Sequence, residues 1–90
     1  RRIFIRPHVC ELEVRETCYF QAAFENVADQ RVRWHVREVQ GGQIDQNGMY
    51  TAPNVVGAYQ LIGESVAHPE LQATTYVVVR DTAQQEIPRA

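Results

Sequence analysis

One seven-residue segment limits the possible folds of this 90-residue chain more than any other. Residues 31–37 alternate strictly between apolar Val32, Trp34 and Val36 and cationic Arg31, Arg33, His35 and Arg37. Successive side chains of an extended strand point to opposite faces, so this period of two predicts a strand with one buried and one solvated face. A second layer of structure must therefore cover Trp34.

The same alternation recurs along the chain and predicts further strands. They lie at residues 9–14, 18–24, 49–52, 58–66 and 73–80. Asn47-Gly48 is typical of a hairpin turn, Pro53 ends a strand, and His68 before Pro69 favours a turn. No segment has the spacing of three and four residues that an amphipathic helix needs.

The two longest predicted strands each divide into two alternating sets of side chains. In segment 58–66 the set Tyr59, Leu61, Gly63 and Ser65 alternates with Gln60, Ile62, Glu64 and Val66, and the pattern leaves open which set is core. In segment 73–80, Thr75, Val77 and Val79 alternate with Thr74, Tyr76, Val78 and Arg80.

About seven short strands without a helix predict an all-β fold. The expected architecture is an antiparallel two-sheet immunoglobulin-like sandwich with Trp34 at its centre, and a closed barrel is the main alternative. A chain of this length supports one core. Residues 1–80 are expected to form the sandwich, and the polar residues 81–90 a linker or tail.

The charge and the hydrophobicity of the sequence argue against two classes of partner. The formal net charge is −2, which argues against a broadly basic nucleic-acid binder. No apolar run exceeds four residues, far below the roughly 20 that a membrane-spanning helix needs. We therefore expect neither nucleic-acid binding nor membrane insertion.

Four ordered elements of the sequence resemble the bacterial immunoglobulin-like domains. They are the tryptophan strand 32–36, the Gly-Gly-x-Ile stretch at 41–44, the Gly-x-Tyr-Thr-Ala-Pro motif at 48–53 and the Gly-x-Tyr start of a strand at 57–59. The resemblance covers residues 7–80. It implies a noncatalytic spacer or adhesive module, often repeated, of a larger surface or secreted bacterial protein. The chain departs from the family at Gly63, where alanine is common and glycine is expected to loosen packing, and at Cys10 and Cys18.

The chain has no motif of an enzyme or a metal site. It contains no nucleophile elbow, phosphate-binding loop or His-Glu-x-x-His sequence, so we expect no catalysis and no cofactor. His8, His35 and His68 lie on different elements, and we expect no metal. Residues 45–48 look like part of a calcium loop but lack its bidentate glutamate, and a plain turn is expected.

The two cysteines lie on the predicted core faces of adjacent strands. If these strands form a hairpin that turns near Arg15 and Glu16, Cys10 lies opposite a residue near Gln21 and away from Cys18. A direct disulfide is then disfavoured. A bridge like that between the second and sixth strands of antibody domains is excluded, since no cysteine follows residue 18. Buried free thiols are expected.

The solvated face of the tryptophan strand is the candidate binding surface. Its predicted residues, together with those of the two strands expected beside it, are Arg31, Arg33, His35, Arg37, Ile62, Glu64, Tyr76 and Val78. Arginine mixed with aromatic and aliphatic groups is typical of interaction sites, although acids could simply pair with the arginines across strands. We expect contacts with neighbouring domains or with another protein. The alternatives are a carbohydrate-binding module that uses Arg31, Arg33 and Arg37 for an anionic glycan, and an accessory domain of a linked enzyme.

Overall fold

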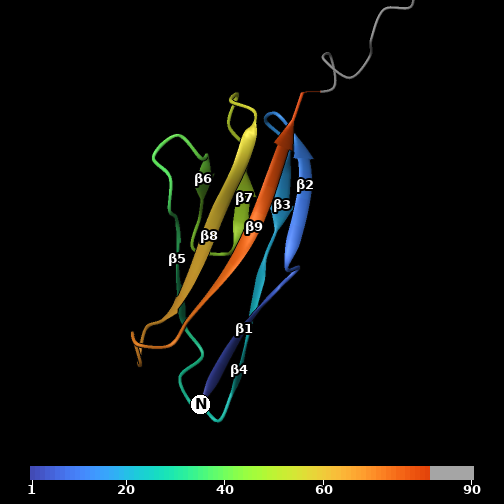
Figure 1. Ribbon diagram of the computed structural model, residues 1–90. Coiled ribbons are helices and arrows are strands. Elements are labelled where there is room, and N and C mark those ends of the chain that lie inside the picture. The colour runs from blue at the N-terminus through green and yellow to red at the C-terminus, as the bar shows by residue number, and fades with distance from the viewer. Residues whose placement is uncertain (82–90) are drawn as a thin grey trace, which may run out of the picture.

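The computed structural model describes residues 1–81, and this part of the chain is built from strands without any helix (Figure 1). The expected all-β class is confirmed. The strands are β1 (Arg2–Arg6), β2 (Val9–Glu13), β3 (Thr17–Tyr19), β4 (Gln21–Glu25), β5 (Val32–Val36), β6 (Gln43–Ile44), β7 (Met49–Thr51), β8 (Gly57–Ser65) and β9 (Gln72–Arg80). With no helix in this range, no described segment meets the length and hydropathy needed for a transmembrane helix. The predicted tail lies, from residue 82 onward, outside the described residues.

The strands of residues 1–81 pair into three sheets. A four-stranded sheet has the order β2-β9-β8-β5, a three-stranded sheet has the order β3-β7-β6, and β1 pairs with β4. The pairing is antiparallel except between β2 and β9, which run parallel. The predictions of about seven strands, of two sheets and of antiparallel pairing throughout are therefore wrong in detail.

The first strand was missed because it does not alternate. β1 contains the apolar run Ile3, Phe4 and Ile5, of which only Ile5 is fully buried. The strand ends at Arg6; the next residue, Pro7, has no N–H for a ladder, and the Arg6–Pro7 peptide bond is cis. After Pro7 the chain moves away from β4 and forms β2, which pairs with β9.

The predicted strand 18–24 is divided at Phe20. β3 pairs with β7 and β4 pairs with β1, so the two halves belong to different sheets. The Phe20 N–H donates to the Gly48 carbonyl at 2.8 Å, and the ring is buried. Residues 17–25 thus pair with two different strands, because the pairing with β7 ends before Phe20 and the pairing with β1 begins after it.

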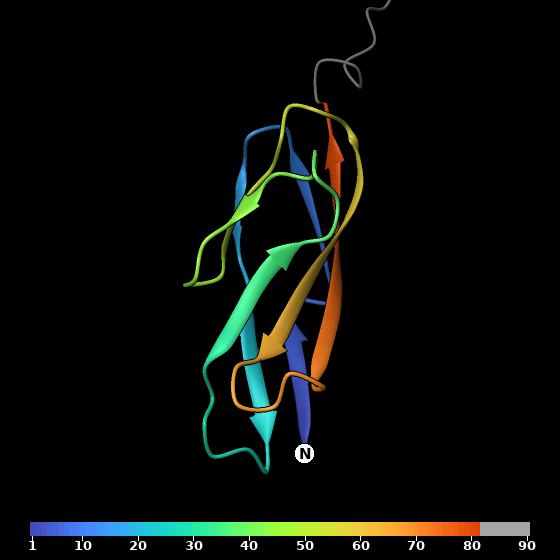
Figure 2. The ribbon, with the colours of Figure 1, turned by 90° about the vertical axis from the view of Figure 1, so that its left-hand side faces the viewer.

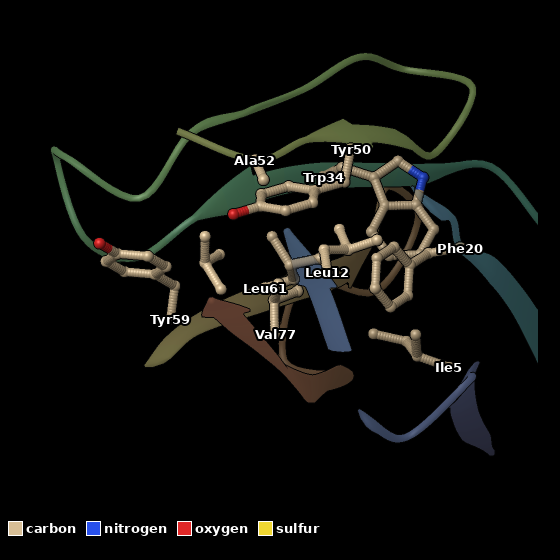
Figure 3. Packing of buried hydrophobic residues seen from close by; sticks show 10 residues of the cluster. Ile5, Leu12, Phe20, Trp34, Tyr50, Ala52, Tyr59, Leu61 and Val77 are labelled. Carbon is tan, nitrogen blue, oxygen red and sulfur yellow. The ribbon is translucent and has the colours of Figure 1, made fainter. Parts of the chain in front are cut away.

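Figure 2 shows the strands arranged in two layers, with β3, β4 and β7 on one side and β8 and β9 on the other. Between them lies one buried cluster, shown in Figure 3: Ile5, Leu12, Phe20, Trp34, Tyr50, Ala52, Tyr59, Leu61, Val77 and Val79. Burying each large apolar side chain contributes about 1.5–3 kcal/mol. Trp34 is 4% exposed, so its predicted core position is confirmed.

The cluster also settles the facing of the long strands. Tyr59, Leu61, Gly63 and Ser65 of β8 are buried. On β9 the buried set is Thr75, Val77 and Val79. Gly63 faces Trp34 closely, so the expected loosening at this position is not found: a Cβ there would lie 3.3 Å from the indole.

The turn at residues 45–48 is held by its own aspartate. One carboxylate oxygen of Asp45 accepts the N–H groups of Asn47 at 2.9 Å and Met49 at 3.0 Å. Gly48 adopts a φ of 91°, which favours glycine. The plain turn expected at these residues is confirmed, and it lets Ile44 of β6 pair with Tyr50 of β7.

The Tyr50 ring packs inward between the layers, beside Trp34 (Figure 3). It meets Phe20 edge to face, with ring centroids 6.3 Å apart. The Tyr50 hydroxyl donates a short hydrogen bond to the Gly41 carbonyl. The motif residues from 41 to 52 therefore build the core on the side of β7.

Candidate functional site

The solvent side of the four-stranded sheet, here called the outer face, brings together most of the predicted binding residues. Antiparallel pairing of β5 with β8 sets Arg33 opposite Glu64 and His35 opposite Ile62. Because directly paired residues point to the same side of a sheet, these four side chains share the outer face.

The outer face continues across β9 and β2. Tyr76 pairs with Gln60 of β8 on one side and with Val9 of β2 on the other. Val78 pairs with Ala58 and with Glu11 in the same way. Pairing therefore runs without a break from the cationic residues of β5 to the acidic residues of β2.

An exposed apolar pair on β2 and β9 distinguishes this face. The side chains of Val9 and Tyr76 are 53% and 47% exposed, and they lie next to each other in register. Ile62 and Val78 are half-buried beside them. Four apolar groups of β2, β9 and β8 thus meet water beside the charged residues of β2 and β5.

The arginines of the predicted site differ in how firmly they are held. Arg33 lies 3.8 Å from the Glu64 carboxylate, and its side chain is mostly exposed. Arg37 follows β5; its backbone N–H donates to the Gln60 carbonyl, and its guanidinium donates to the Gln60 side-chain oxygen, both at 2.9 Å. These two residues stay at the border of the outer face.

Arg31 is turned toward a loop aspartate. Its guanidinium donates to both carboxylate oxygens of Asp29, with distances from 2.7 to 3.2 Å, and its backbone N–H also donates to Asp29 at 3.1 Å. These hydrogen bonds lower the pKa of Asp29 to about 2. Arg31 therefore belongs to a local ion pair, whereas Arg33 and His35 lie within the paired strands.

The sequence missed the part of the outer face contributed by β2. Val9, Glu11 and Glu13 alternate with buried Leu12, and this alternation did predict which side chains are solvated. It carried no information on the neighbouring strand, because a parallel partner is not linked by a short turn. Arg80 of β9 reaches Glu11 of β2 at 2.8 Å and closes this border.

Open hollows lie beside the other edge of the sheet. One, of about 340 Å³, is lined by apolar and amide-bearing residues that include Val39, Gln43 and Pro53. Another, of about 380 Å³, lies along β5 and β6 between His35 and Ile44. Within residues 1–81, no three metal-ligating side chains gather in one place.

The two cysteines lie where the predicted hairpin does not place them. β2 pairs with β9 and β3 with β7, so Cys10 and Cys18 belong to different sheets. The Cys10 thiol donates to the Cys18 sulfur at 2.7 Å. The expected separation is therefore wrong, because the chain crosses between layers at Arg15 and does not fold back within one sheet. Both cysteines are free thiols here, as expected, but each is half-buried and not fully buried as predicted.

Burial alters the acidity of one thiol. The pKa of Cys10 is raised to about 12, first because burial disfavours the thiolate and then because of the hydrogen bond with Cys18. Cys10 therefore remains protonated at neutral pH.

Comparison with known proteins adds no assignment: no family model matches the chain, and no curated protein is significantly similar to it.

Proposed function

We propose that this chain is a noncatalytic immunoglobulin-like sandwich module of a larger bacterial surface or secreted protein. It acts as a structural or adhesive unit, and it binds a protein partner or a neighbouring domain through the outer face. The order β5-β8-β9 and the buried Trp34 on β5 support the sandwich, since immunoglobulin domains keep a buried tryptophan on strand C of their C-F-G sheet.

A single observation carries the choice of surface. Exposed Tyr76 and Val9 lie side by side on β9 and the edge strand β2, with Arg33 on the opposite edge strand β5. Protein interfaces are enriched in tyrosine and arginine, and their apolar centre is surrounded by polar groups. The outer face has this composition.

A protein partner suits this face better than an anionic glycan. A glycan would have to displace Asp29 from Arg31 and Glu64 from Arg33, and each displacement removes an existing favourable contact. A protein can instead cover Tyr76 and Ile62 while leaving those pairs in place. The glycan remains an outcome of the test.

Photo-crosslinking tests the proposal. A photoreactive phenylalanine analogue replaces Tyr76 in the protein on the cells that produce it, and Tyr19 in a matched control. Tyr19 lies on β3 of another sheet and is 51% exposed, close to the 47% of Tyr76. We expect a discrete protein, or a neighbouring domain, to be crosslinked from position 76 and not from position 19.

A second measurement makes the outcome specific. The crosslinked protein or domain, once purified, should bind the chain at least tenfold more weakly after Arg33→Ser and Tyr76→Ala, and with unchanged affinity after Tyr19→Ala. Equal crosslinking from both positions would overturn the choice of surface. A periodate-reactive polysaccharide attached at position 76 would establish the glycan alternative.

A further inference from the structure

The two thiols meet at the junction of the two layers. Cys10 lies opposite Val77 in the β2–β9 pair, and Cys18 lies opposite Tyr50 in the β3–β7 pair. Val77 and Tyr50 are fully buried, so both cysteines face the interior from opposite layers. Their sulfurs are 2.7 Å apart.

We propose that Cys10 and Cys18 form a disulfide bond that joins the two layers when the protein is exposed to a disulfide oxidant. This inference does not rest on the proposed function.

The oxidant is a low-molecular-weight disulfide of the glutathione type. The thiolate of one cysteine attacks a sulfur of the oxidant, breaks its S–S bond and releases one thiol. The second cysteine, after losing its proton, attacks the first cysteine's sulfur in the mixed disulfide, so that the Cys10–Cys18 S–S bond forms, the mixed S–S bond breaks and the second thiol is released. Two electrons pass from the cysteine pair to the oxidant, whose two thiol products take up the two protons.

The backbone on both sides already holds the sulfurs close to bonding distance. A disulfide joins sulfurs about 2.05 Å apart, so closure needs an approach of roughly 0.7 Å. The flanking residues are fixed: the Val14 N–H donates to the Arg80 carbonyl at 3.0 Å, and the Ala52 N–H donates to the Glu16 carbonyl at 2.8 Å. The pair is thus arranged by the sheets, and oxidation needs no change of register.

The bond would constrain the unfolded chain more than the folded one. It closes a short loop across the crossing at Arg15, and such a loop lowers the entropy of the unfolded state. For a domain of this size the expected gain corresponds to a rise in Tm on the order of 10 °C. The half-buried, protonated Cys10 attacks slowly at neutral pH, so complete oxidation requires long equilibration.

The test uses the wild-type chain equilibrated with excess oxidised glutathione, then denatured and treated with N-ethylmaleimide. We expect a monomer that has lost two hydrogens and carries no maleimide adduct, whereas the chain kept in reductant takes up two. Trypsin cuts after Arg15, so the peptide ending there should be joined to the peptide that begins at Glu16 until a reductant is added.

Other results would overturn the proposal. These are two maleimide adducts after equilibration, a stable glutathione adduct on each cysteine, or a disulfide between two copies of the chain. In the variant with both Cys10→Ser and Cys18→Ser the Tm should not respond to oxidant. Because the thiol count is made on the wild-type protein, the test stands even if this variant fails to fold.

Discussion

Trp34 and Gly63 are direct partners across the β5–β8 pair, and the indole occupies the space that a side chain at position 63 would need. A Cβ at Gly63 would lie 3.3 Å from Trp34 Cζ3 and 3.0 Å from Ile5 Cδ1. The largest core residue is therefore accommodated by the smallest residue on the neighbouring strand. Both layers depend on this fit, since Ile5 belongs to β1.

Replacing Gly63 by alanine should destabilise the protein by about 1 kcal/mol. Overpacking of a core typically costs about 1–3 kcal/mol, and the loss of backbone freedom in the unfolded chain returns about 0.4–1 kcal/mol. Urea unfolding measures the difference. In a double-mutant cycle, Ile5→Val removes the atom at 3.0 Å and should relieve part of the cost. A more stable Gly63→Ala protein would contradict this account of the packing.

Trp34→Ala should cost about 3–5 kcal/mol, because it opens a large cavity beside Phe20 and Tyr50. Equilibrium unfolding in denaturant gives the value, and His35→Ala, on the exposed side of the same strand, is the matched control with an effect within about 0.5 kcal/mol. A loss below about 1 kcal/mol for Trp34→Ala would show that the indole is not part of the core.

Gly48→Ala should weaken the hairpin between β6 and β7. The residue adopts a φ of 91°, and an added Cβ would meet the Phe20 carbonyl oxygen at 2.2 Å. We expect a cost of about 1–3 kcal/mol from the backbone strain alone, and more if Phe20 must move. Asn47→Ala changes the same turn at a position without positive φ and should cost less. Thermal unfolding of both variants compares the two losses of stability, and an equal loss would contradict this explanation.

The stability of the protein should fall at alkaline pH, in part through Tyr50. Burial raises the pKa of Tyr50 from 10.0 to about 12, so the unfolded chain loses the phenolic proton first. The contribution of Tyr50 is complete below pH 10 and is lost as the pH rises toward 12. Tyr50→Phe should remove this part of the decline, while the lost hydrogen bond to Gly41 costs about 1–3 kcal/mol at neutral pH. Denaturant midpoints between pH 8 and pH 12 test both effects; an unchanged alkaline profile would contradict the assignment.

Acid should remove the stabilisation that Asp29 receives from Arg31. The pKa of Asp29 is lowered from 3.8 to about 2, so this contribution is present above pH 3.8 and is lost as the pH falls toward 2. An NMR titration of the Asp29 carboxyl measures the value directly. In Arg31→Gln the pKa should return toward 3.8, and a value that stays low would assign the shift to another group.

The sequence predicted the parts of this fold that repeat with a period of two. The alternation around Trp34 assigned the buried and solvated sides of β5 correctly. It failed at β1, where Ile3, Phe4 and Ile5 follow one another without alternation. It also failed at Phe20, because periodicity continues through a residue at which the hydrogen-bonding partner changes.

The candidate site shows the same division between local pattern and long-range pairing. Arg33 and His35 were assigned to the solvated side from their own strand, and their neighbours Glu64 and Ile62 follow from antiparallel pairing with β8. The contribution of β2 depends on a parallel contact between residues more than sixty positions apart. The contact between Cys10 and Cys18 depends on the crossing of the chain between the two layers at Arg15. No spacing in the sequence encodes that crossing.

The parallel pairing of β2 with β9 determines how the described part of the chain would bear tension. Residue 1 and the end of β9 lie at opposite ends of the described part of the molecule (Figure 1). A force that pulls on these two points therefore slides β2 and β9 past each other along their length. The pairs from Val9–Tyr76 to Glu13–Arg80 are then loaded in shear and must break together, whereas a peeled hairpin opens one pair at a time.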